Sequence, residues 1–266
     1  IRVLPKSDYE NHVFDKPTII YVQTRKLCES LCDDISNKGI KCACYHGGML
    51  RQQKNTSHER FLKGDVLVIV ATISFGMGID KSDIREVINY GVPNDIESYY
   101  QEIGRAGRDG LMSETTIYYQ SSDFATANYL INTSKDPEQR AIKGNALNTF
   151  RRYLSENHLC RQQMIEYYFE NGTIPNEDEA KHIPKCGICD NCLCTKTLNM
   201  VDIKLEATFI VNYIKDFYAR YNYTLGLDKL SSAIRKDCGI INIKSKKKCI
   251  EIIEFLITKD ILKRTS

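Results

Sequence analysis

The sequence contains no long apolar run and carries little net charge. No apolar stretch approaches the roughly 20 residues that a membrane-spanning helix requires, which argues against a membrane protein. The 37 basic and 34 acidic residues leave a formal net charge of only +3, so average charge alone does not indicate nucleic-acid binding. Residues 1–5 contain neither an initiator Met nor the pattern of a signal peptide, and we expect position 1 to be a cut point.

The chain is longer than a usual single domain. Its 266 residues and a composition shift near residue 135 favour two or three domains, and we expect boundaries at 1–134, 135–200 and 201–266. The eleven cysteines are an odd number spread along the chain, so at least one cannot pair internally. We therefore expect a reducing, intracellular compartment, with some thiols bound to metal.

The first half predicts a parallel α/β lobe. Short apolar runs rich in β-branched residues alternate with amphipathic stretches that end at Gly39 and Gly64. This alternation is typical of βαβ units in a sheet covered by helices. The expected strands are 18–22, 40–45, 66–71, 87–90 and 115–119, and the expected helices are 26–37 and 51–62.

Polar or glycine-rich residues follow three of these strands, where parallel sheets bind ligands. Residues 23–25, 46–48 and 72–80 occupy these positions. Gly76 and Gly78 would allow the backbone to approach a ligand closely, and Asp80 could accept a hydrogen bond from a ribose hydroxyl. Simple turns remain the alternative for these glycines.

Residues 98–110 carry a more specific pattern. If they are helical, Gln101, Arg105 and Arg108 lie on one face, and two helix glycines cost about 1 kcal/mol each relative to Ala. Two guanidiniums in fixed register suit a transferring phosphoryl group, which indicates an arginine finger. The alternative is a pair of surface arginines bound to acidic neighbours.

Taken together, Gln-x-x-Gly-Arg-x-x-Arg at 101–108, Ala-Thr-x-x-Phe-Gly-Met-Gly-Ile-Asp-Lys at 71–81 and Tyr-His-Gly-Gly at 45–48 closely resemble motifs of superfamily-two helicases. Glu-Ser-Tyr-Tyr-Gln-Glu at 97–102 resembles the RecQ family in particular. The resemblance is strong over residues 15–200. It implies a second RecA-like lobe, a helical zinc-binding subdomain and a partial winged helix.

The resemblance also implies roles for single residues. Arg105 and Arg108 match the arginines of the sixth motif, with Arg108 as the finger, and Gln101 and Asp80 match positions that couple the ATP and DNA sites. Gly78 belongs with Asp80, Arg105 and Arg108 to the expected nucleotide site. Residues matching the single-stranded DNA track are Thr24, Arg25, His46 and Thr72, for which an N-cap, a turn hydroxyl or a buried histidine is the alternative.

One expected motif is absent from the sequence. There is no Gly-x-x-x-x-Gly-Lys-Ser/Thr loop, and the acidic stretch at 178–182 only superficially resembles an acidic box. ATP with Mg²⁺ in this family lies between two RecA-like lobes. We therefore expect this chain to share ATP with a missing first lobe of the same polypeptide, and to be inactive alone.

The cysteines at 186–192 predict a metal site. Cys186, Cys189 and Cys192 form overlapping Cys-x-x-Cys turns, a spacing that indicates zinc rather than redox thiols or an iron–sulfur cluster. Cys160 is the favoured fourth ligand, by resemblance to the RecQ zinc module. A shell of four protein sulfurs would make the site structural. The alternative fourth ligands are Cys194, His158 and His182.

The tail predicts helices at 203–219, 227–235 and 249–258, consistent with a truncated winged helix. Lys246, Lys247 and Lys248 lie in a basic stretch expected to precede the last helix. They could bind duplex phosphates, and a solvated charged loop is equally plausible.

The resemblance implies part of an ATP-dependent 3′–5′ helicase that unwinds duplex DNA in recombination, repair or replication. Its partners would be single-stranded and duplex DNA, in a nucleus, a bacterial cytoplasm or a viral replication site. An RNA helicase of the same superfamily is one alternative. The other is a non-catalytic DNA-binding module made of the zinc site and the winged helix.

Overall fold

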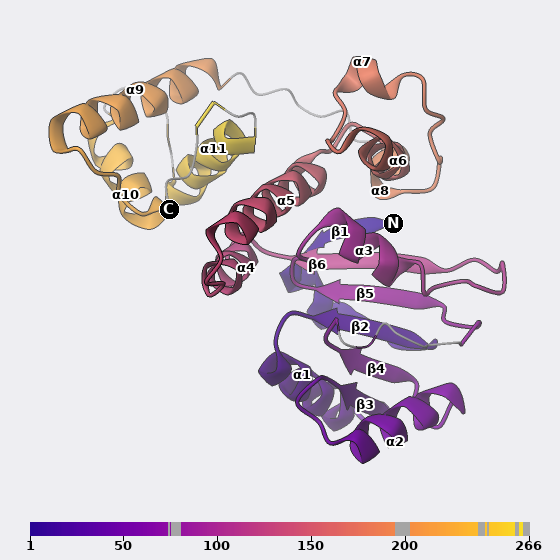
Figure 1. The fold of residues 1–266 in the computed structure, drawn as a ribbon. Helices are drawn as coiled ribbons and strands as arrows, with labels where there is room; N and C mark the ends of the chain where they lie inside the picture. Colours follow the sequence, from indigo (N-terminus) through magenta and orange to yellow (C-terminus); the bar gives the residue numbers. More distant parts are fainter. Residues whose placement is uncertain are drawn as a thin grey trace. The chain divides into compact units, whose positions relative to one another are not determined.

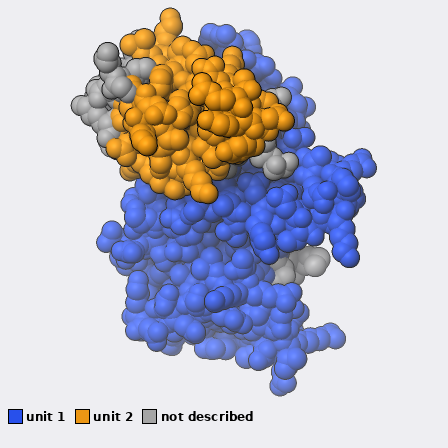
Figure 2. Space-filling view, turned by 90° about the vertical axis from the view of Figure 1, so that its left-hand side faces the viewer, with its two compact units in different colours: residues 1–194 blue, residues 195–266 orange. Residues whose placement is uncertain are grey.

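The computed structural model describes residues 1–73, 75, 81–194, 203–238, 243, 245–258 and 261–262. The chain divides into two compact units, unit 1 with residues 1–194 and unit 2 with residues 195–266 (Figure 2). Among the described helices, none combines the length and the apolar character needed to cross a membrane.

Unit 1 is built on a six-stranded sheet in which all neighbouring strands are parallel, in the order β1-β6-β5-β2-β4-β3 (Figure 1). The five predicted strands are confirmed, and the sequence patterns missed the edge strand β1. The strands are β1 (Arg2–Pro5), β2 (Thr18–Val22), β3 (Cys42–Tyr45), β4 (Val68–Ala71), β5 (Glu86–Tyr90) and β6 (Glu114–Tyr119).

The central strands are buried on both faces, so alternate residues enter different cores. On one face Ile20 and Val70 pack against the 3-10 helix η1 (Lys6–Asn11) and helix α1 (Arg25–Asn37). On the other face Ile19 and Ile69 pack against Phe61 of α2 (Arg51–Leu62). The helices end near Gly39 and Gly64 with φ of 82° and 78°, which confirms the predicted glycine stops.

Helix α3 (Ile96–Ile103) is shorter than expected. Asp95 caps its start and Gly104 ends it, so the expectation of one helix carrying Gln101, Arg105 and Arg108 on a single face is wrong. Gly107 has a φ of 67°, and a Cβ there would lie 2.7 Å from the Ser113 Oγ. The two glycines therefore end the helix and shape the following turn, which removes the supposed cost of glycines within a helix.

The remaining helices of unit 1 share a core with the sheet. Tyr99 of α3 packs with Phe150, Tyr153 and Met164, which lie on two of these helices. The residues on either side of position 134 thus belong to one compact unit, and the proposed domain boundary there stays a prediction. The helices are α4 (Asp123–Asn132), α5 (Pro137–Ser155), α6 (Arg161–Asn171), α7 (Glu177–Ala180) and α8 (Asp190–Leu193).

Unit 2 contains three described helices, α9 (Lys204–Tyr221), α10 (Leu227–Asp237) and α11 (Lys246–Thr258). They agree with the three predicted helices and enclose a core that includes Ile210, Ile234 and Cys249. The described part of unit 2 shows helices and no strand, so the winged helix stays a prediction.

Candidate functional site

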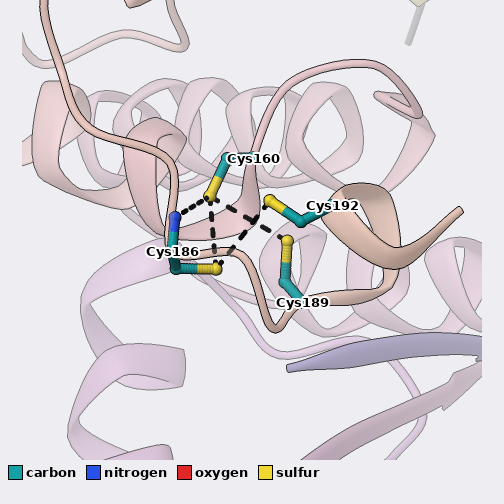
Figure 3. A group of neighbouring side chains, drawn as sticks. All are labelled: Cys160, Cys186, Cys189 and Cys192. Carbon is teal, nitrogen blue, oxygen red and sulfur yellow. Dashed lines mark hydrogen bonds between the residues drawn. The ribbon is translucent and has the colours of Figure 1, made fainter.

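The structure brings the four predicted metal ligands together (Figure 3). Cys160 and Cys189 are the N-cap residues of α6 and α8, Cys192 lies within α8, and Cys186 directly precedes Gly187, whose φ is 72°. The four Sγ atoms lie within 4.8 Å of one another, with separations of 3.4 Å for Cys160 and Cys186 and 4.0 Å for Cys186 and Cys192.

These separations match a tetrahedral zinc site. With Zn–S bonds of about 2.3 Å, the sulfurs of a tetrahedron lie about 3.8 Å apart. The group gathered within ligand distance contains neither His158, His182 nor the exposed Cys194, so none of the three alternatives completes it among the described residues. Four thiolates would fill the coordination shell and leave no open position for a reacting water.

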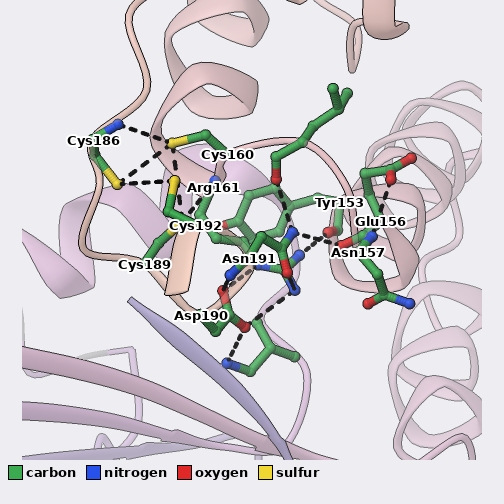
Figure 4. Close-up of polar contacts among 12 residues, drawn as sticks. Tyr153, Glu156, Asn157, Cys160, Arg161, Cys186, Cys189, Asp190, Asn191 and Cys192 are labelled. Atoms are coloured by element: carbon green, nitrogen blue, oxygen red, sulfur yellow. Dashed lines mark hydrogen bonds and ion pairs between the residues drawn. The ribbon is translucent and has the colours of Figure 1, made fainter. Parts of the chain in front are cut away.

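A buried ion pair supports the cysteine cluster (Figure 4). The Arg161 side chain is 2% exposed, and its Nε and Nη2 donate to the two carboxylate oxygens of Asp190 at 3.0 and 3.2 Å. Its Nη1 donates to the Tyr153 carbonyl at 2.6 Å. Burial opposes the charge, but the hydrogen bond to Asp190 keeps the pKa of Arg161 above its usual value.

Asp190 also ties the cysteine cluster to the sheet. Its carboxylate accepts a hydrogen bond from the Val3 N–H at 2.9 Å, and its own N–H donates to the Ile1 carbonyl at 3.0 Å. Asn191 donates to the carbonyls of Glu156 and Leu159, at 3.0 and 2.8 Å. Sequence reasoning missed these residues, although the Asp-Asn pair between two cysteines was a visible signal.

The residues of the expected DNA track lie at the carboxyl ends of β2, β3 and β4. The Thr24 Oγ1 accepts from the Leu27 N–H at 3.2 Å and caps α1, in agreement with the N-cap alternative. Arg25 is exposed, and a Cβ at Gly48 would lie 3.2 Å from its side chain. The glycine therefore leaves space for the arginine at this edge of the sheet.

The His46 side chain is buried and lies close to Gly48 and Glu29. Its Nδ1 accepts from the Gly48 N–H at 3.2 Å, and its Nε2 lies 3.1 Å from a carboxylate oxygen of Glu29. The Thr72 N–H donates to the Tyr45 carbonyl at 3.1 Å, which places Thr72 beside His46 at the same edge. The arrangement agrees with a buried structural histidine, and direct contact of His46 with DNA stays a prediction.

The loop of residues 104–113, here called the arginine loop, carries both predicted catalytic arginines. Arg108 is exposed, with its Nε 3.5 Å from the Gly104 carbonyl, while Arg105 is half-buried. Arg105 interacts with the hydroxyl of Tyr21. Burial raises the pKa of this hydroxyl above its usual value, and Arg105 partly opposes the shift. Gln101 is exposed in the last turn of α3. The two other expected nucleotide-site residues, Gly78 and Asp80, lie outside the described residues.

Glu102, which lies between Gln101 and Arg105 in the sequence, is a buried residue of the last turn of α3. The Asn89 Nδ2 donates to its carboxylate at 2.5 Å. Burial raises the pKa of Glu102 to about 8, although the Asn89 hydrogen bond and the nearby Arg105 oppose the shift. Near neutral pH this carboxyl is therefore largely protonated, which avoids an unpaired buried charge.

This pKa predicts how stability depends on pH. Between the ordinary value of 4.5 and about 8, folded Glu102 holds a proton that the unfolded chain lacks, so stability falls as pH rises. The free energy of unfolding of wild type should therefore fall relative to that of Glu102→Gln, and we expect the difference between the two proteins to grow by about 3–5 kcal/mol from pH 5 to pH 9. Urea unfolding at pH 5, 7 and 9 measures the difference. The exposed Glu170→Gln is the control, and a pH-independent difference would contradict the assignment.

The basic patch lies in a different structural setting from the one expected. Lys246, Lys247 and Lys248 form the first turn of α11 rather than a loop before it, which corrects the prediction. Lys246 pairs with Asp228 at 2.5 Å and Lys248 with Glu206 at 3.4 Å. These ion pairs satisfy two of the ammonium groups within unit 2, whereas Lys247 is exposed.

Comparisons with known proteins support both parts of unit 1. Residues 3–110 match the family described as helicase conserved C-terminal domain, and residues 121–193 match the RecQ zinc-binding family. The chain is 39% identical to the mouse bifunctional 3′-5′ exonuclease/ATP-dependent helicase WRN, over 67% of this chain and 13% of that protein.

Two further relatives match almost the whole chain. The ATP-dependent DNA helicase RecQ of Bacillus subtilis is 32% identical over 92% of this chain and 41% of its own length. A putative ATP-dependent RNA helicase of Acanthamoeba polyphaga mimivirus is 31% identical over 95% of this chain and 47% of its own length. The chain thus spans less than half of each relative. On the two family matches and these identities, the chain belongs to the RecQ family of superfamily-two helicases, as the C-terminal part of the helicase region.

Proposed function

We propose that this chain is the second motor lobe of an ATP-dependent DNA helicase that translocates 3′ to 5′ on single strands. The observation that carries the proposal is the exposed Arg108 on a loop of fixed shape. The carboxylate of Asp109, the next residue, lies 2.6 Å from the Nη2 of Arg85. This hydrogen bond lowers the pKa of Asp109 and keeps the ion pair formed at neutral pH.

ATP with Mg²⁺ would bind between this lobe and a first lobe of the same polypeptide that carries the phosphate loop. Arg108 would reach the γ-phosphate and stabilise the charge that develops on its oxygens, and Arg105 would bind the nucleotide beside it. Gln101 would contact the nucleotide from the end of α3. This chain alone would not hydrolyse ATP, since its sequence contains no phosphate loop.

Single-stranded DNA would cross the carboxyl edge of the sheet. The exposed Arg25 and the backbone near Thr24 and Thr72 would contact phosphates, which requires no particular base sequence. Zinc held by the four clustered cysteines would fix the helical region. Of Lys246, Lys247 and Lys248, the exposed Lys247 would be the one to contact duplex phosphates. The activity belongs to an intracellular compartment that contains DNA.

The test is ATP hydrolysis stimulated by single-stranded DNA, with the natural polypeptide that joins both lobes. Arg108→Ala should lower kcat by about 10³-fold, because an arginine finger contributes 10³–10⁵ to phosphoryl transfer. Arg60→Ala, which removes an exposed arginine from α2, should leave kcat unchanged. Full activity in Arg108→Ala would remove the finger assignment. An inactive wild type would favour a non-catalytic DNA-binding module.

An RNA helicase is the second candidate, because a relative that matches 95% of this chain is named a putative ATP-dependent RNA helicase. The same assay with RNA and DNA strands of equal length and sequence distinguishes the two. We expect DNA to stimulate hydrolysis more strongly, and preferential stimulation by RNA would reverse the substrate assignment.

A further inference from the structure

The tip of the arginine loop exposes two large apolar side chains beside Arg108. Leu111 is 66% exposed and Met112 is 85% exposed. Single exposed apolar residues are ordinary on protein surfaces, so exposure alone carries little meaning. Here, however, the two side chains are adjacent and lie three and four residues from the proposed finger.

The backbone that presents them is held by specific hydrogen bonds. Arg85 donates through Nη1 to the Met112 carbonyl at 3.3 Å and through Nη2 to Asp109 at 2.6 Å. The Leu111 N–H donates to the Asp109 carboxylate at 3.0 Å, and the Gly107 N–H donates to the Ile84 carbonyl at 2.9 Å. The loop is therefore a defined turn anchored at the amino end of β5.

The backbone before these two side chains makes a tight turn. Gly107 adopts a φ of 67° and approaches the Leu111 carbonyl so closely that a Cβ would lie 2.9 Å away. Because the backbone of this loop is already fixed, binding through Leu111 and Met112 would lose little further backbone entropy, and the main entropic cost would be the rotamer freedom of the two side chains. Burial of these two apolar side chains against a partner surface would favour association.

We propose that Leu111 and Met112 dock onto the nucleotide-binding lobe of the same polypeptide when ATP draws the two lobes together. The inference rests on the proposed function, because Arg108 on the same loop must meet phosphates held by that lobe. The relatives, of which this chain spans less than half, leave ample length for such a lobe. An apolar contact next to Arg108 would limit how closely the two lobes approach each other.

The test uses the two-lobe polypeptide with the double change Leu111→Ser and Met112→Ser. We expect the KM for ATP to rise at least tenfold, because closure loses apolar contact, while affinity for single-stranded DNA without nucleotide changes less than twofold. The swap Leu111→Met with Met112→Leu keeps apolar bulk and should preserve the KM. Ile142→Ser, which replaces a 61% exposed apolar side chain of α5 with serine, is the matched control.

Several outcomes would overturn the inference. An unchanged KM in the double variant, together with collapse of activity in Arg108→Ala, would reject the docking contact and leave the proposed function standing. Loss of nucleotide-free DNA affinity would assign the tip to DNA, and a change in molecular mass by light scattering would assign it to a second copy. A wild type without DNA-stimulated hydrolysis would reject both the function and the docking contact.

Discussion

Replacement of Cys189 by serine is expected to abolish zinc binding and to unfold the helical region around α6 and α8. Cys189 is 1% exposed and starts α8, and its sulfur accepts from the Arg161 N–H at 3.4 Å. A hard hydroxyl in place of a thiolate removes one of four soft ligands. Structural zinc contributes about 10 kcal/mol or more to small zinc modules, so the expected loss exceeds any other single contact in this region.

Metal content and hydrogen exchange together measure this effect. Wild type should hold one zinc per chain, and Cys189→Ser none after dialysis against a weak chelator. Amide protection should disappear in α6 and α8 but persist in β2 and β4, whose cores contain no cysteine ligand. Cys194→Ser is the control, because Cys194 is exposed and lies outside the cluster. Equal zinc content in both variants would contradict the ligand assignment.

Much of the sheet was predictable from local patterns. Strand β2 was predicted with its observed limits, because Thr18–Val22 combines four β-branched residues with one tyrosine in a short run that is buried on both faces. Helix α2 was likewise predicted at residues 51–62, since a glycine with positive φ stops it two residues later. In both segments local signals agree with the tertiary structure: a short apolar run identifies β2, and the glycine stop identifies the end of α2.

The end of α3 was not predictable from the same signals. The spacing of Gln101, Arg105 and Arg108 matches a helical face, yet the backbone leaves the helix at Gly104. The deciding contact is long-range, because the Gly107 N–H donates to the Ile84 carbonyl near the start of β5. A helical period cannot reveal that a loop returns to a strand more than twenty residues earlier.

The candidate site was predictable where covalent spacing limits geometry and not where distant segments meet. Three cysteines within seven residues must lie close together, so the metal cluster followed from the sequence. Strand β1 pairs with β6 across more than a hundred residues, and its contact with Asp190 spans the whole of unit 1. Neither contact leaves a local pattern, so both required the structure.

Replacement of Asp190 by alanine is expected to destabilise unit 1 by about 3–5 kcal/mol, because it leaves the buried Arg161 charge without its partner. The change also removes the acceptor for the Val3 N–H, so β1 loses its link to the cysteine cluster. Urea unfolding should show the loss as a lower midpoint. Asp178→Ala is the matched control, because Asp178 forms an ion pair with Lys181 but its side chain is 86% exposed. This change should alter the free energy of unfolding by less than about 0.5 kcal/mol.

A double variant separates the effect of the buried charge from the loss of the hydrogen bond between Asp190 and β1. Arg161→Met combined with Asp190→Ala removes both charges and should recover part of the stability, because a buried ion pair is often replaceable by apolar groups. The recovery should stay incomplete, since the Val3 N–H remains without its acceptor. Zinc content should be unchanged in the double variant, because neither side chain is a thiolate. If Asp190→Ala and the double variant were equally unstable, the tie between Asp190 and β1 would outweigh the ion pair, and unit 1 would depend on that edge strand more than on the buried charge.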